Sequence, residues 1–133
     1  MFILFLIAAV IFFSIDMLWL GVVAKKLYRD ELGFILSNEV NWIAALIFYV
    51  IYLVGVLHFA VIPALKEQSW ITALIQGAAL GFLCYATYDL TNMATISKWP
   101  LKIVIIDIAW GTFLTCAVSL LTYLAAVKFN IMK

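Results

Sequence analysis

The chain opens on an apolar segment, FILFLIAAVIFFSIDMLWLGVV at residues 2–23, that only Ser14 and Asp16 interrupt. About 20 apolar residues in an α-helix span the hydrocarbon core of a bilayer. Lipid offers no partner to free backbone N–H and C=O groups, and the segment lacks the alternation of a barrel strand, so we expect a helix. Because it lacks a basic leading region and a small-residue cleavage site, we interpret it as a retained first helix rather than a signal peptide.

Three more apolar segments follow, at residues 41–65, 70–93 and 102–127. The chain is 68% hydrophobic and 11% charged, whereas soluble domains are about half apolar and about a quarter charged. We therefore predict a single all-α domain over residues 1–133, an integral membrane four-helix bundle with up-down-up-down topology. We expect the lipid bilayer to be its partner and solvent.

The connection at residues 24–40 mixes charged and apolar side chains. This pattern is typical of an interfacial helix, which we expect to break at Gly33. Tryptophans often stand at the membrane–water interface, and we assign that role to Trp42, Trp70 and Trp99 at the span ends.

Basic residues favour one orientation of the chain. The connections 24–40 and 94–101, with the start of the fourth span, carry Lys25, Lys26, Arg29, Lys98 and Lys102, whereas the opposite side carries Lys66, Lys128 and Lys133. Cytoplasmic loops are enriched in Lys and Arg, so we predict cytoplasmic connections and outside termini in the cytoplasmic membrane. The small difference leaves insertion in both orientations open.

Several classes of site are excluded or disfavoured. The net charge of +1, without an arginine-rich patch, excludes nucleic acid as a partner. Cys84 and Cys116 lack metal or disulfide spacing and are interpreted as packing residues. His58 is the only histidine, and it is a secondary candidate that more often serves as a hydrogen-bonded core residue. We predict no metal site and no cofactor.

Three aspartates lie within the apolar segments: Asp16, Asp89 and Asp107. They are almost half of the seven carboxylates, and each costs about 2.5–3.5 kcal/mol near a helix centre. The first and third helices run in one direction and the fourth runs back, so all three acids fall toward the same membrane face. We predict that they border a shared cavity suited to binding a proton, a cation or a substrate.

The neighbours of each acid extend this candidate site. Ile15-Asp16-Met17-Leu18-Trp19 and Ile106-Asp107-Ile108-Ala109-Trp110 share a pattern whose i, i+3 spacing places an indole beside the carboxylate on its own helix. Asp89 stands among Tyr85, Tyr88 and Asn92. Two interpretations without a binding function remain open. The acids could form hydrogen bonds between helices, and Asp89 could reach water or an interfacial lysine.

Small residues mark faces on the third and fourth helices. Gly77 and Gly81 form a small-xxx-small pattern, and Gly111, Thr115 and Ser119 form a small polar stripe. Such faces permit close approach of helices, either within the bundle or between two subunits.

Three motifs resemble those of a known family. They are Tyr85-Ala86-Thr87-Tyr88-Asp89-Leu90-Thr91-Asn92 followed by Trp99-Pro100-Leu101, then Asp107-Ile108-Ala109-Trp110-Gly111-Thr112, and near the N-terminus Asp16-Met17-Leu18-Trp19-Leu20-Gly21. Over nearly its whole length the chain resembles the uncharacterised bacterial membrane proteins grouped as domain of unknown function 2177. The resemblance implies a compact four-helix protein of the bacterial cytoplasmic membrane and supplies no activity, substrate or cofactor.

Three functions stay open. Intramembrane acid facing a cavity favours a small proton- or cation-coupled transporter, which in a chain this small implies a homodimer. A membrane enzyme or accessory subunit would use the aspartates and tyrosines on a lipid-soluble substrate. The lack of a nucleophile–base pair or dense metal motif makes an enzyme the less favoured interpretation. An assembly subunit would pair its acids with a partner's Lys or Arg.

Overall fold

The computed structural model describes residues 1–36 and 39–131, and within these residues the chain is helical without strands. The elements are α1 (Phe2–Leu18), η1 (Trp19–Val23), α2 (Ala24–Leu32), α3 (Trp42–Val56), η2 (Leu57–Val61), α4 (Ile62–Glu67), α5 (Trp70–Thr95) and α6 (Leu101–Lys128). The π-helical turns η1 and η2 join their α-helical neighbours, so the described residues contain four helices long and apolar enough to cross a membrane. Lys133, used in the charge comparison above, lies outside the described residues, as do residues 37–38.

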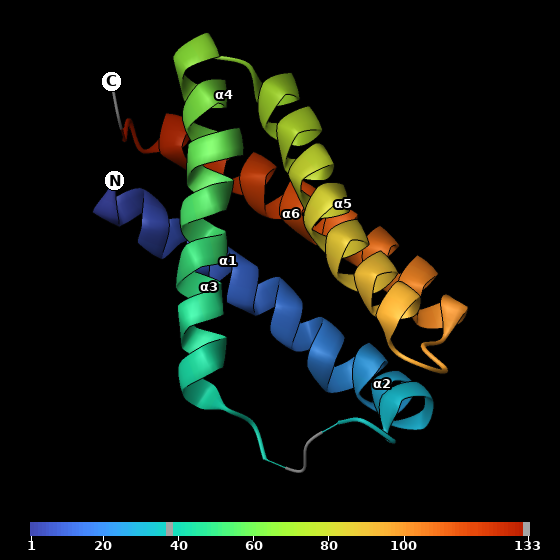
Figure 1. Cartoon of the computed structure of the whole chain (residues 1–133). Coiled ribbons are helices and arrows are strands. Elements are labelled where there is room, and N and C mark those ends of the chain that lie inside the picture. The colour runs from blue at the N-terminus through green and yellow to red at the C-terminus, as the bar shows by residue number, and fades with distance from the viewer. Residues whose placement is uncertain (37–38, 132–133) are drawn as a thin grey trace.

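The four long helices alternate in direction and pack as a bundle, which confirms the predicted fold class (Figure 1). At one end, Leu32 of α2 packs with Trp99 and Ile103 around the start of α6. At the other end, Ala64 of α4 packs with Ala73 and Tyr123. The N-terminus and the C-terminal end of α6 lie on this second side, as the topology requires (Figure 1).

Local signals explain where the helices begin. The side chain of Asn41 accepts a hydrogen bond from the backbone N–H of Ala44 at 3.1 Å and so caps α3. Ser69 caps α5 in the same way through the N–H of Thr72 at 3.2 Å. Between α4 and α5, Gln68 takes a left-handed conformation with φ 52°, which reverses the chain in a tight turn.

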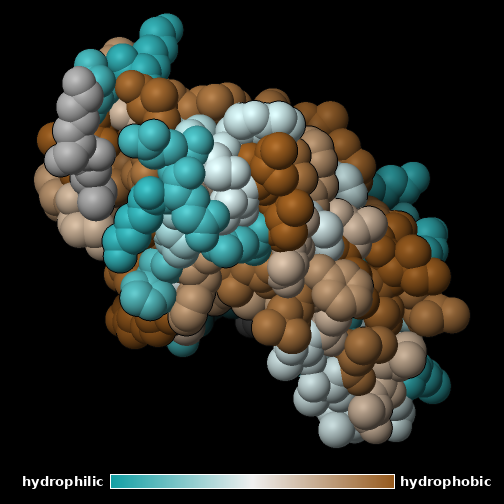
Figure 2. Space-filling model, turned by 90° about the horizontal axis from the view of Figure 1, so that it is seen from above, coloured by the Kyte–Doolittle hydropathy of each residue, from teal (hydrophilic) through white to brown (hydrophobic). Residues whose placement is uncertain are grey.

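The core forms where three helices meet. Leu4, Ala8 and Phe12 of α1 lie against Leu53 of α3 and Leu114 of α6, and all are almost fully buried. Outside this core, large apolar side chains remain exposed along every long helix. Figure 2 shows hydrophobic side chains over wide areas, with hydrophilic ones gathered on the end that faces the viewer. A bilayer provides the solvent for such a surface.

The helices α5 and α6 make the most extensive contact in the bundle. A Cβ added to Gly77 would lie 2.6 Å from Oγ of Ser119, and one added to Gly81 would lie 2.3 Å from the carbonyl oxygen of Gly111. Only glycine permits this approach. The small-residue faces were expected to pack either within the bundle or between two subunits. In the structure both faces pack within the bundle, one against the other.

The predicted helix after the first span is present as α2, and it ends at Gly33 as expected. It continues the first span through η1 without a break, so the helix runs from Phe2 to Leu32. Nζ of Lys102 on α6 lies 2.9 Å from Oε1 of Glu31 and ties α2 to the start of α6. Its placement in the membrane interface stays a prediction.

Candidate functional site

All three intramembrane aspartates are buried. Their exposed fractions are 6% for Asp16, 0% for Asp89 and 7% for Asp107. Within the described part of the chain, no Lys or Arg forms an ion pair with any of them. The protein therefore holds three carboxyl groups in its interior, and no cationic side chain of the described residues balances them.

Asp89 of α5 and Asp107 of α6 lie next to each other. The hydroxyl of Tyr28, on α2, donates a hydrogen bond to Oδ1 of Asp107. Asp89 is close to Trp99 in the α5–α6 connection, yet neither carboxylate oxygen of Asp89 has a hydrogen bond of normal geometry to the described residues. The result is an acid pair in which one member has a phenol donor and the other has none.

The π-helical turn η1 explains how Tyr28 reaches this site. Residues of an α-helix advance by about 100° each, so Tyr28 would lie about 120° away from Asp16 on a regular helix. A π-helical turn accommodates one extra residue, which reduces the offset to about 20°. Asp16 and Tyr28 accordingly line the same cavity.

Asp16 has a different environment. It lies close to Trp110 of α6 and Tyr49 of α3. The indole rings of Trp19 and Trp110 stack on each other, with centroids 4.3 Å apart and planes 8° from parallel. Asp16 therefore has the Trp110 indole of another helix as a close neighbour, and Trp19 of its own helix lines the same cavity. Trp19 also lies close to Tyr28.

Two cavities border Asp107 and Asp16, one each. One of about 440 Å³ is lined by Phe48, Tyr52, Cys84, Tyr85, Tyr88 and Asp107. A smaller one of about 170 Å³ is lined by Phe12, Asp16, Trp19, Leu20, Tyr28, Phe48, Tyr49, Tyr85 and Trp110. Because Phe48 and Tyr85 line both cavities, the two share an aromatic wall. The three acids thus converge on one region but are divided between an acid pair and a single acid.

The larger cavity lies between the diverging parts of α3 and α5. Figure 1 shows these helices close together near η2 and apart toward the other end. The contacts agree, since α5 packs against η2 and only slightly against α3. Phe48 and Tyr88, one on each helix, are 49% and 60% exposed. The cavity therefore reaches the side of the bundle.

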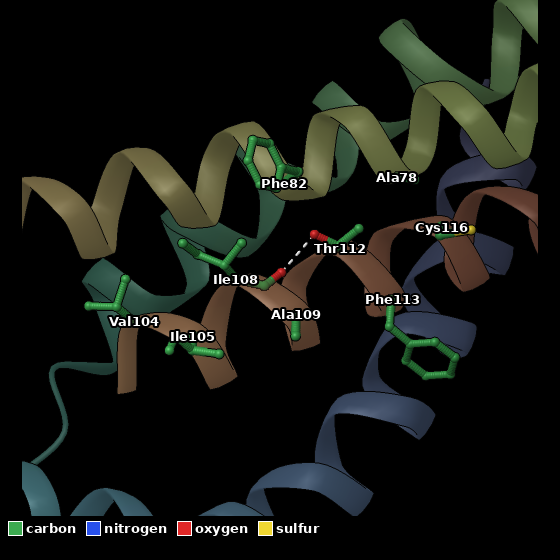
Figure 3. Close-up of a pocket in the computed structure, with 9 residues that line it drawn as sticks. All are labelled: Ala78, Phe82, Val104, Ile105, Ile108, Ala109, Thr112, Phe113 and Cys116. Carbon is green, nitrogen blue, oxygen red and sulfur yellow. Dashed lines mark hydrogen bonds between the residues drawn. The ribbon is translucent and has the colours of Figure 1, made fainter. Parts of the chain in front are cut away.

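A third depression differs from these two in chemistry. It has a volume of about 530 Å³ and lies along α6 and its neighbour α5, among Ala78, Phe82, Ile105, Ala109 and Phe113 (Figure 3). The hydroxyl of Thr112 is engaged with the carbonyl oxygen of Ile108 at 2.7 Å. No acid lines it, so it is an apolar groove on the outside of the bundle.

The remaining candidate residues divide between the acid site and other positions. Tyr88 lines the larger cavity and lies close to Asn92. His58 lies in η2, exposed on the side of the bundle, with its ring edge-on to Phe59 at 4.8 Å. In the described part of the chain, no group of three His, Cys, Asp or Glu residues is placed to hold a metal ion.

Sequence reasoning missed several residues at the site. Tyr28 was expected in an interfacial segment, and Trp99 was expected at the interface, but the latter is only 7% exposed and contacts Tyr88 at 6.0 Å between centroids. Phe48 and Tyr49 carried no signal, because aromatic residues in an apolar span are ordinary. One signal in the sequence did point to Trp99. The family resemblance includes Trp99-Pro100-Leu101 as the motif that follows the Asp89 motif along the chain.

The profile of one protein family matches residues 1–124, which is most of the chain, and the family is described as "Predicted membrane protein (DUF2177)". The chain belongs to this family. No curated protein and no solved structure gives a match. The matched region of this DUF2177 protein contains all three acids and both stacked tryptophans. Membership supports a multi-pass membrane protein and attaches no chemistry to these residues.

Proposed function

We propose that this DUF2177 protein is a small proton- or cation-coupled transporter whose site is built on Asp16, Asp89 and Asp107. One observation carries the proposal: all three carboxyl groups are buried without an ion pair to any described Lys or Arg, and two of them, those of Asp16 and Asp107, line cavities. Buried charge is expensive unless it is paired or neutralised. A proton or a cation arriving from outside the chain supplies that neutralisation, and its arrival and departure constitute the transport cycle.

Aromatic residues around the acids support the same proposal. Trp19 and Trp110 wall the Asp16 cavity, while Tyr85 stands between it and the acid pair. Aromatic faces attract cations and exclude water at the same time. A site that only held helices together would not need space beside its polar groups.

Proton-coupled flux in proteoliposomes tests the proposal. Wild-type protein is expected to carry protons inward when an outward gradient of a transported cation is imposed. Asp16→Asn and Asp107→Asn are expected to abolish this flux, because an amide can neither release a proton nor balance a cation. Asp30→Asn makes the same change at an exposed position of α2 and serves as the matched control. Full flux in folded Asp16→Asn and Asp107→Asn proteins would refute the proposal.

A second function is favoured by the adjacency of Asp89 to Asp107, which lines the larger cavity. Two close carboxyl groups in different environments suit acid–base chemistry, here on a lipid-soluble substrate, by an enzyme or its accessory subunit. Turnover of added lipid by the purified protein, lost in Asp89→Asn, would establish it. Unchanged lipid after long incubation would leave transport as the function.

We further propose that the DUF2177 protein lies in the bacterial cytoplasmic membrane as a homodimer. The connections around Lys25 and Lys98 would then be cytoplasmic and the termini outside, as the basic residues favour. Reporter fusions at residue 131 and within the connection at 33–36 test the orientation. Cross-linking in native membranes tests the dimer. Activity of a fluorescent-protein fusion at residue 131 would contradict a single orientation with outside termini.

A further inference from the structure

We propose that the larger cavity binds a lipophilic organic monocation, with Asp107 as its counter-ion, and that the cation displaces a proton shared by Asp89 and Asp107. The inference rests on the proposed transport function and names its substrate class. Neither the family nor the proposed function specifies a ligand of this kind.

The size of the cavity selects an organic ligand. Small-molecule sites usually measure about 300–1,000 Å³, and the cavity beside Asp107 measures about 440 Å³. The cavity beside Asp16 measures about 170 Å³, below that range, and has room for water or a small ion only. The two cavities are thus suited to different occupants.

The lining selects a cation with apolar substituents. Four of the six lining residues are aromatic, namely Phe48, Tyr52, Tyr85 and Tyr88, and the only carboxyl group among them is that of Asp107. Aromatic faces bind organic cations through their quadrupoles, most strongly where the cation is desolvated. A divalent metal ion would need a denser set of ligands, and the described residues provide none.

The acid pair supplies the proton. Two ionised carboxylates next to each other within a bundle would repel each other and both lose hydration, so one of the two acids, Asp89 or Asp107, holds a proton while the site is empty. When the cation binds, the bond between this proton and the carboxyl oxygen breaks and the proton leaves to solvent. The pair then carries two negative charges, one of which the bound monocation balances, and one proton is released for each cation bound.

Other titratable groups face the pair and bear on its charge. Tyr28 approaches from α2, Tyr52 from α3, and Cys84, Tyr85 and Tyr88 from α5. Asp16 of α1 lies across the aromatic wall. Lys102, on α6, is engaged with Glu31 rather than with the pair. The Asp89–Asp107 pair therefore has no fixed cation among the described residues.

The position of the opening sets the route of the ligand. Phe48 and Tyr88 are both half-exposed on the side of the bundle, where α3 and α5 diverge. This side faces lipid in a four-span protein, so a ligand reaches Asp107 from within the bilayer. The route admits cations that partition into lipid and disfavours hydrated inorganic ions.

Binding of tetraphenylphosphonium to purified protein in detergent tests the inference. Calorimetry in buffers of different ionisation enthalpy measures protons released for each cation bound. The expected result is one proton, with affinity rising about tenfold per unit of pH while the pair remains protonated. Asp107→Asn is expected to lose the proton release and to weaken binding about tenfold or more. Asp107→Glu is expected to retain both, and exposed Asp30→Asn is expected to match the wild type.

The outcomes separate this inference from the function on which it rests. If sodium or methylammonium releases protons through Asp107 and tetraphenylphosphonium does not bind, the organic-cation inference is overturned while transport stands. If tetraphenylphosphonium binds equally to wild type and to folded Asp107→Asn and Asp107→Glu, the site assignment is overturned. If no cation releases a proton from the wild type, both the inference and the coupled transporter are overturned.

Discussion

Replacement of Gly81 by alanine tests the close approach of α5 and α6, which positions the Asp89–Asp107 pair. An added Cβ would lie 2.3 Å from the carbonyl oxygen of Gly111 and 2.6 Å from Oγ1 of Thr115, whereas ordinary contact begins near 3.4 Å. The closest atom belongs to the backbone, so rotation of a side chain does not relieve the clash. The two helices must separate by about 1 Å, in an interior where packing tolerates little change.

The magnitude follows from two opposing effects. Overpacking costs about 1–3 kcal/mol, and alanine recovers about 1 kcal/mol of helix propensity relative to glycine. We therefore expect Gly81→Ala to lower the free energy of unfolding by up to about 2 kcal/mol, which lowers the midpoint temperature by up to about 10 °C. Gly55→Ala is the matched control, since nothing lies within 4 Å of an added Cβ there. It is expected to be neutral or stabilising by up to about 1 kcal/mol.

Thermal unfolding of the purified variants in a mild detergent, followed by circular dichroism and by size-exclusion chromatography, measures the difference. Gly81→Ala should unfold below the wild type and Gly55→Ala at or above it. Equal midpoint temperatures for the two variants would refute the close contact and, with it, the position assigned to the acid pair.

Three further predictions concern single contacts. Tyr28→Phe removes the hydrogen-bond donor to the acid pair and is expected to lower the free energy of unfolding by about 1–2 kcal/mol. Tyr123→Phe is its control, because the Tyr123 hydroxyl has no hydrogen bond to the described residues. This control should change the free energy of unfolding by less than about 0.5 kcal/mol. Replacing Trp19 and Trp110 by leucine, singly and together, should give a coupling energy of about 0.5–1.5 kcal/mol by thermal or chemical unfolding, and additive losses would contradict their stacking. His58→Phe should leave cation-linked proton release unchanged, since this side chain lies outside both acid-lined cavities, and a loss on calorimetry would place it in the site.

The fold was predictable because the length and apolar composition of each segment identify the membrane-spanning helices. The segment at 2–23 is too long and too apolar for a soluble helix, and the turn at Gln68 separates two further segments of this kind. The alternation of direction then follows from short connections, and it brings the acids to one end. Gly81 also predicted a close helix contact, since small residues serve little other purpose in lipid.

The site itself was only partly predictable, because its geometry depends on departures from regular helices. A regular α-helix would turn Tyr28 away from Asp16, and no pattern in the sequence announces the extra residue that η1 accommodates. The pairing of Trp110 with Asp16 across helices depends on the crossing of α1 and α6, which spacing along one helix does not contain. The divergence of α3 from α5, which makes the larger cavity, is likewise a tertiary property.

The energetic cost of burying the three acids is consistent with the proposed function. At about 2.5–3.5 kcal/mol each, ionised Asp16, Asp89 and Asp107 would together cost about 7–10 kcal/mol, as much as the whole folding free energy of many proteins. Asparagine would make hydrogen bonds between helices at a lower cost. Carboxyl groups offer two properties that amides lack, a negative charge and an exchangeable proton, and the proposed exchange of a proton for a cation would use both.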